Sequence, residues 1–169
     1  MEEWIYSHSI SALVEITGVN RFSLYSEFDS KEGILHNALN LYFARYAQPK
    51  LYLLDIEADT TLALKNFFNS YLVNKEKHPP GCFYIYIGTE MTDSDVIVKE
   101  KLNSYINTIE SCLKNIVDRD TELKARGDFL ARQLSGLFCS SVSFCLIHTP
   151  EERIAYIDRG IKVILNKVK

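Results

Sequence analysis

Residues 9–46 read SISALVEITGVNRFSLYSEFDSKEGILHNALNLYFARY, and this stretch decides the fold of the chain. It predicts a short helix, a turn of sequence TGVN and a second short helix over residues 21–28, followed by a longer helix after Ser30. Gly18 suits the positive φ that reverses a chain at the end of a helix. Two short helices joined across a glycine turn are the sequence form of a helix-turn-helix.

The second short helix predicts a surface that contacts DNA. Apolar side chains at residues 10, 13, 24 and 28 can pin the two helices together, which leaves the other side of residues 21–28 facing outward. In a helix-turn-helix this outward face enters the DNA major groove. The alternative is that the same motif serves only in packing.

The same residues resemble the N-terminal motif of the TetR/AcrR transcriptional repressors, which runs S-I-x-x-L-V-E-x-T-G-V-x-R-x-S-L-Y-x-x-F-x-S-K-E-G-L. The resemblance covers about a quarter of the 169 residues. It implies an all-α protein with a helix-turn-helix module over residues 1–46 and a helical ligand-binding and dimerisation domain over residues 47–169. The function it implies is a ligand-responsive repressor that binds double-stranded operator DNA as a homodimer.

The residues assigned to DNA on this basis lie on the second short helix and beside it. Lys31 is included because backbone N–H groups in the first turn of a helix favour a phosphate, although an ordinary solvated lysine is the alternative. The full set is Ser9, Arg21, Phe22, Ser23, Tyr25, Ser26 and Lys31.

The charge of the module opposes DNA binding. Residues 1–46 carry three basic side chains against six acidic ones, and the whole chain has a net charge of −3. Phosphate neutralisation supplies most nonspecific affinity for DNA. The resembled family also has a complete helix ahead of the motif, where this chain has only residues 1–8. We therefore expect weak DNA binding by this 169-residue form, with fast hydrogen exchange in residues 9–28 and slow exchange in residues 125–165.

The composition indicates a cytoplasmic protein without a cofactor or a metal. No apolar run approaches the ~20 residues that span a membrane, so no membrane association is expected. The four cysteines lack metal-ligand spacing and are predicted to be reduced thiols, with a redox-sensing Cys82 as the alternative. No phosphate loop, nucleophile elbow or HExxH motif is present. Glu90 as a catalytic acid is the only basis for an enzyme, and we predict none.

Helical spacing continues to the end of the chain. The helix after Ser30 is expected to end at Gln48 and Pro49, with a loop or a single helical turn over residues 50–58. Residues 82–91 have the composition of a buried strand, but they are predicted to be a helix because no partner strand follows. Further helices are predicted over residues 60–77, 96–118 (after a cap cluster at 92–95), 121–147 and 149–168.

Aromatic side chains on the central helices suit either a core or a mostly apolar pocket. The resemblance implies a small apolar or aromatic ligand between these helices, with Glu90 as a polar anchor. The candidate ligand-binding residues are Phe67, Tyr71, Tyr86, Glu90, Tyr105 and Phe138.

The last two predicted helices are apolar, and the first of them is rich in small residues. Together they expose more apolar surface than a monomer tolerates, which predicts a homodimer. The candidate interface residues are Leu137, Phe144, Ile154, Ile157 and Ile161. The second hypothesis for the whole protein is a dimeric small-molecule-binding protein that has lost DNA binding.

Overall fold

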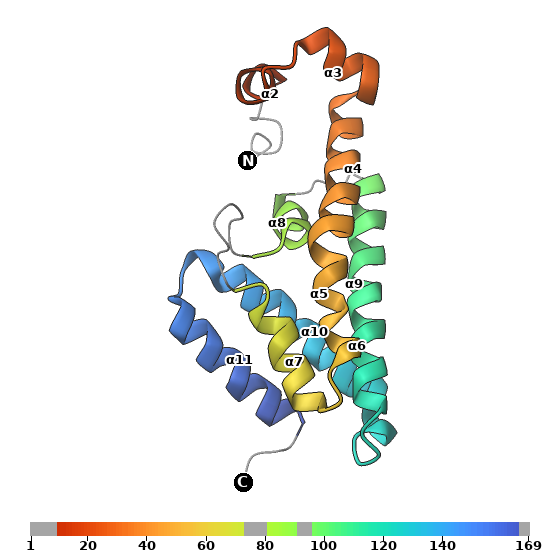
Figure 1. Cartoon of the computed structure of the whole chain (residues 1–169), viewed down its shortest axis with the longest axis vertical. Coiled ribbons are helices and arrows are strands. Elements are labelled where there is room, and N and C mark those ends of the chain that lie inside the picture. The colour runs from red at the N-terminus through yellow and green to blue at the C-terminus, as the bar shows by residue number, and fades with distance from the viewer. Residues whose placement is uncertain (1–9, 73–80, 91–95, 166–169) are drawn as a thin grey trace.

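The computed structural model describes residues 10–72, 81–90 and 96–165 of the chain. These residues form helices joined by turns and contain no strand, which confirms the all-α prediction, including the helix predicted from the strand-like segment. A small head of two helices lies at one end of a long rod, which is formed by residues 31–56. The rod runs into a larger helical body (Figure 1).

The head contains α2 (Ile10–Thr17) and α3 (Arg21–Phe28), and it meets the rod at α4 (Lys31–Tyr42). Gly18 has φ 70° in the turn between α2 and α3, as its predicted role requires. The side chain of Asn20 accepts a hydrogen bond from the Ser23 N–H at 2.8 Å, and Ser30 accepts one from the Gly33 N–H at 3.0 Å. These caps begin α3 and α4.

The rod continues beyond Pro49, so the predicted end of the helix at Gln48 and Pro49 is wrong. After α4 the chain forms a π-helical turn, η1 (Phe43–Ala47), and then α5 (Gln48–Leu51) and α6 (Leu53–Ile56). The Gln48 N–H donates to the Phe43 carbonyl, five residues back. The wider turn places Pro49 at the beginning of α5. In the first turn of a helix the backbone N–H groups have no acceptor within the helix, so a proline there costs no hydrogen bond.

The body is built from the remaining helices. These are α7 (Thr60–Asn69), α8 (Phe83–Glu90), α9 (Val96–Asp118), η2 (Lys124–Arg126), α10 (Gly127–Ser143), η3 (Phe144–Leu146) and α11 (Pro150–Ile164). The single helix predicted over residues 121–147 is divided, because a short 3₁₀ turn stands at each end of α10. Of the helix predicted over 60–77, residues 73–77 lie outside the described part.

The packing of the body extends into the rod. α10 lies between α9 and α11, and α7 packs on α11. Leu39 of α4 belongs to the main hydrophobic core, and its carbonyl accepts a hydrogen bond from the Tyr84 hydroxyl at 3.2 Å. The core of the body thus begins within α4, before the boundary that we predicted after residue 46.

Thr149 begins α11 with the predicted capping box. Its hydroxyl accepts from the Glu152 N–H at 3.3 Å, and Glu152 accepts from the Thr149 N–H at 2.9 Å. Such reciprocal bonds satisfy two backbone donors that a helix start leaves without partners. Within the described residues, no helix is both long enough and apolar enough to cross a bilayer.

Candidate nucleic-acid interface and ligand domain

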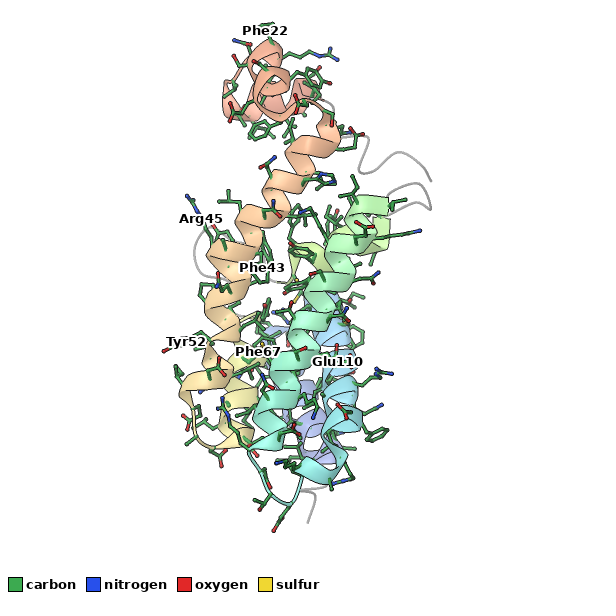
Figure 2. The ribbon with its side chains drawn as sticks, turned by 90° about the vertical axis from the view of Figure 1, so that its right-hand side faces the viewer. Phe22, Phe43, Arg45, Tyr52, Phe67 and Glu110 are labelled. Carbon is green, nitrogen blue, oxygen red and sulfur yellow. The ribbon has the colours of Figure 1, made fainter. Side chains whose placement is uncertain are left out.

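The outer face of α3 has the geometry that the sequence predicts. Arg21, Phe22, Ser23 and Ser26 are exposed, Tyr25 is half-buried, and only Leu24 of this helix is buried. Figure 2 shows Phe22 at the far end of the head, away from the body. With 82% of its side chain exposed, Phe22 is an apolar group placed where it can meet a base or a thymine methyl.

Arg21 and Tyr25 form one unit on this face. The guanidinium carbon of Arg21 lies 5.5 Å from the centroid of the Tyr25 ring. A cation held over an aromatic ring keeps its N–H donors available at the other edge of the guanidinium. The pair can therefore present a positive charge and a hydroxyl to the same stretch of DNA.

The other two residues assigned to DNA lie beside α3. Lys31 is half-buried in the first turn of α4, next to the acidic Glu32. Ser9 lies outside the described residues. Gly33 allows α3 and α4 to approach closely, because a Cβ at this position would collide with the Phe28 carbonyl.

Three of the predicted ligand residues form a closed aromatic cluster. The Phe138 ring centroid lies 5.6 Å from Phe67 and 4.9 Å from Tyr71, and all three side chains are buried. The Tyr71–Phe138 pair is edge-to-face and the Phe67–Phe138 pair is tilted, and such packing of buried rings is typical of a core. In this structure the three residues fill the interior of the body between α7 and α10.

Tyr105 is also buried, within a hydrogen-bonded group of polar atoms. Its ring stacks on Tyr84 at 4.3 Å, and its hydroxyl lies 3.1 Å from the Tyr71 hydroxyl and 3.3 Å from the Cys82 sulfur. Burial is the main cause that raises the pKa of both Tyr71 and Tyr105 above the usual value. Both phenols therefore stay protonated and act as neutral hydrogen-bonding groups.

The remaining two predicted ligand residues differ from these four. Tyr86 is 44% exposed and Glu90 is half-buried, both on α8. The hydrogen bond that the Tyr86 hydroxyl donates to the Glu90 carboxylate is the main cause that raises the pKa of Tyr86. These two residues form a polar pair near the surface and are not part of the aromatic cluster.

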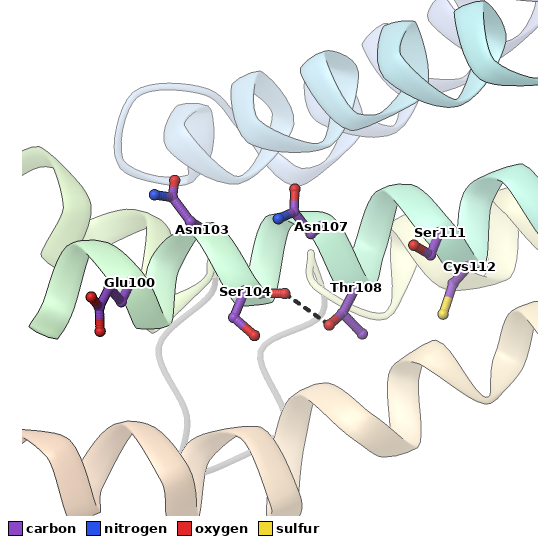
Figure 3. A pocket seen from close by; sticks show the side chains of 7 residues that line it. All are labelled: Glu100, Asn103, Ser104, Asn107, Thr108, Ser111 and Cys112. Carbon is purple, nitrogen blue, oxygen red and sulfur yellow. Dashed lines mark hydrogen bonds between the residues drawn. The ribbon is translucent and has the colours of Figure 1, made fainter.

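An open groove of about 610 Å³ lies along α9, but none of the predicted ligand residues lines it. Figure 3 shows its side chains along α9: Ser104 and Thr108 lie on the side toward the rod, whereas Asn103 and Asn107 point away from it. The lining side chains are polar apart from Cys112, which does not suit a mainly apolar ligand. The lining residues are Glu100, Asn103, Ser104, Asn107, Thr108, Ser111 and Cys112.

The candidate interface residues separate into two groups. Ile157 and Ile161 are both 0% exposed within one chain, so their assignment to a dimer interface is corrected: they belong to the core. Leu137 is also buried and packs so tightly on α11 that a Cβ at Gly160 would lie 2.6 Å from its methyl group. Phe144 is half-buried and Ile154 is exposed, so these two can still reach a partner.

The last two helices are predicted to form the dimer interface, but the predicted residues do not include Phe129, Tyr156 and Val163, which the structure leaves exposed on the outer face of α10 and α11. The Ser140 and Tyr156 hydroxyls, 3.0 Å apart, join the two helices along this face. Gly136 has open space around it. The exposed apolar side chains of the two helices are Phe129, Ile154, Tyr156 and Val163.

Sequence reasoning also missed a buried cation. Arg153 lies on the inner side of α11, four residues before Ile157, and both side chains are buried. A charged residue at the apolar spacing of a helix is the signal that could have found it.

No family model matches the chain, and no curated protein matches it either. Two solved structures are similar over nearly the whole chain, both of cysteine-substituted forms of the TetR family transcriptional regulator CifR in complex with 26 bp double-strand operator DNA. The first has 19% identity and a TM-score of 0.84, covering 94% of this chain and 87% of that chain; the second has 18% identity and a TM-score of 0.82, covering 94% and 86%.

The described part of the chain is thus a helix-turn-helix head on an all-α body. This is the fold of the TetR family regulators, as the resemblance of residues 9–33 implied.

Proposed function

We propose that this protein is a TetR-type transcriptional repressor that binds double-stranded operator DNA as a homodimer and releases it when a small molecule binds the body. The observation that carries the proposal is the exposed outer face of α3, on a fold shared with regulators solved on operator DNA. Such a regulator acts in the cytoplasm, the compartment in which we place this protein. An enzymatic function is not part of the proposal.

Two copies of the head would compensate for its unfavourable charge. A dimer presents two α3 helices to half-sites about one helical turn apart, 34–36 Å, which doubles the number of contacts. In each head the Arg21 guanidinium and the Tyr25 hydroxyl can contact a guanine edge or a phosphate. Phe22 would add an apolar contact in the major groove.

Replacing Arg21 with alanine is expected to weaken operator binding by about 1–3 kcal/mol. The change removes the cation from the exposed face of α3 and leaves the buried Leu24 in place. Operator sequences are first selected from a random 26 bp duplex library. Binding of wild type and variant is then compared by fluorescence anisotropy at fixed salt.

Arg45→Ala is the matched control for this prediction. Arg45 is also an exposed arginine, but it lies on the rod, away from the head (Figure 2). We expect the Arg45 variant to bind the selected DNA as wild type does. Equal losses in the two variants would mean that overall charge, and not the face of α3, accounts for the binding.

We assign the homodimer to the outer face of α10 and α11. This face carries exposed Phe129, Tyr156 and Val163, and Gly136 leaves room for a partner helix to approach. An interface of this kind should bury on the order of 1,200 Å² or more in total. Burial of these side chains would explain why they are apolar.

The rod offers a route from the body to the head. Phe43 of the π-helical turn packs edge-on against Tyr105, with ring centroids 6.3 Å apart, and Leu39 lies in the core. A ligand that moves the aromatic cluster would therefore tilt α4 and change the separation of the two α3 helices. The ligand would favour a conformer that no longer matches the operator.

The acidic head favours a second candidate, a dimeric small-molecule-binding protein that has lost DNA binding. Within residues 10–46, the basic residues Arg21, Lys31 and Arg45 face four acidic ones. The selection from random duplexes separates the two candidates. Enrichment of a palindromic sequence supports the repressor, whereas no enrichment at low salt supports the second candidate.

A further inference from the structure

Arg153 is a buried cation for which no acidic partner is found among residues 10–72, 81–90 and 96–165. It lies in the first turns of α11, only 4% exposed. No carboxylate in the described part of the chain is within ion-pair distance of its guanidinium. An arginine cannot lose its proton in a protein, so the charge remains in the interior.

The contacts that Arg153 does make are weak for a full positive charge. One terminal nitrogen, Nη1, donates to the Cys145 sulfur at 2.7 Å, and Nη2 donates to the Leu72 carbonyl at 3.4 Å. Nε is buried and has no hydrogen-bond partner. A buried charge with a thiol and one carbonyl as acceptors is unfavourable, because neither carries the negative charge that offsets desolvation.

A second cation faces the same sulfur. Lys50 of α5 holds its ammonium group 3.9 Å from the centroid of the Tyr71 ring. Burial raises the pKa of Cys145, and the charges of Arg153 and Lys50 both lower it, so both cations act on this side chain. One positive charge thus contacts the Cys145 sulfur, and a second lies over the ring of Tyr71, in the apolar cluster.

We propose that Arg153 is the anchor for the carboxylate of a small amphipathic ligand. The two carboxylate oxygens would accept from the guanidinium in the place that the Cys145 sulfur now takes, and Lys50 would supply the second positive charge. A planar guanidinium matches a carboxylate in a two-point contact, which is the strongest neutralisation available to a buried arginine. The apolar part of the ligand would lie against Tyr71 and its aromatic neighbours.

This inference names the ligand class of the proposed regulator, and only its effect on transcription rests on the proposed function. Binding of the carboxylate depends on side chains of the body, with Arg153 as its anchor, and can be measured without DNA. The competing explanation is structural: Arg153 ties the turn after α7 and the turn η3 to α11 through Leu72 and Cys145.

The experiment compares matched pairs of ligands on the full chain. The probes are hexanoate, octanoate, decanoate and phenylacetate, each with its neutral amide, and the measurements are the melting temperature and titration calorimetry. At least one carboxylate is expected to raise Tm by several degrees near saturation, while its amide does not. If no carboxylate in the series exceeds its amide, the proposal is overturned.

Variants of Arg153 separate the anchor from the structural explanation. Arg153→Met is expected to fold with unchanged or higher Tm, because it removes an uncompensated charge, and to lose the response to carboxylates. Arg153→Lys keeps the charge but not the two-point contact, so its affinity should fall about tenfold or more. Carboxylate binding that is unaffected in Arg153→Lys would overturn the proposal, as would a large drop in Tm of unliganded Arg153→Met.

Cys145→Ala is the control on the other side of the contact. Removing the sulfur frees the guanidinium for the ligand, so carboxylates should bind at least as tightly as to wild type. Weaker binding in this variant would show that the sulfur is part of the site and would contradict the assignment.

Discussion

Ile157→Asp is expected to leave the body unfolded, whereas Val163→Asp is expected to be a folded monomer. The two positions lie on one helix, α11, but on different sides of it. Ile157 is 0% exposed, and Val163 is 56% exposed. The pair therefore tests which side of α11 packs in the core and which side is available to a second copy.

The effect at Ile157 is large because two costs add. Truncating a buried isoleucine costs about 2–5 kcal/mol, and a carboxylate buried without a partner costs several more. Total stability of a domain is about 5–15 kcal/mol. Circular dichroism should therefore show loss of helix or a strongly lowered melting temperature.

Val163→Asp is expected to change the oligomeric state and not the fold. In the monomer an aspartate on the outer face of α11 stays in water. The variant should therefore keep the helix content of wild type and a Tm close to that of the wild-type monomer. In a dimer it would place a charge among the apolar side chains of the interface. Sedimentation at micromolar concentration should shift from twice 19.4 kDa toward 19.4 kDa. A wild type that sediments as a monomer, or a Val163→Asp protein that remains dimeric, would reject this interface.

Phe67→Ala is expected to cost about 3–5 kcal/mol of stability, the range for truncating a buried phenylalanine. Phe67 is fully buried and lies 5.5 Å from Phe68 and 5.6 Å from Phe138, centroid to centroid. Its removal leaves a cavity inside the aromatic cluster, and the surrounding rings can collapse into it only in part. Urea unfolding monitored by circular dichroism measures the loss.

Tyr86→Ala is the control for Phe67. Tyr86 was a candidate ligand residue on the same grounds, but it is exposed on α8, and surface substitutions usually change stability by within about 0.5 kcal/mol. A loss below about 1 kcal/mol for Phe67→Ala would mean that Phe67 lines an open pocket in solution. A large loss places Phe67 in the core of the free protein.

The sequence by itself determined the head. The turn residue Gly18, the caps Asn20 and Ser30, and the outward face of α3 all follow from contacts within four residues or from one helical period. Local backbone chemistry decides such features, so a short sequence motif is enough to predict them. The same holds for Thr149, whose capping box uses only residues 149–152.

Only the tertiary structure decided which apolar and charged side chains are buried. The spacing of Ile154, Ile157 and Ile161 shows that they lie on one side of α11, but not how far α7 and α10 cover that side. Pro49 illustrates the same limit, because the π-helical turn that accommodates it depends on the packing of Phe43 and Ala47. Arginine is usually a surface residue. Arg153 is buried because α11 packs it against the turn after α7 and the turn η3, where it donates to the Leu72 carbonyl and the Cys145 sulfur. Burial is a property of the whole chain: it depends on contacts between segments far apart in sequence, and no local pattern contains them.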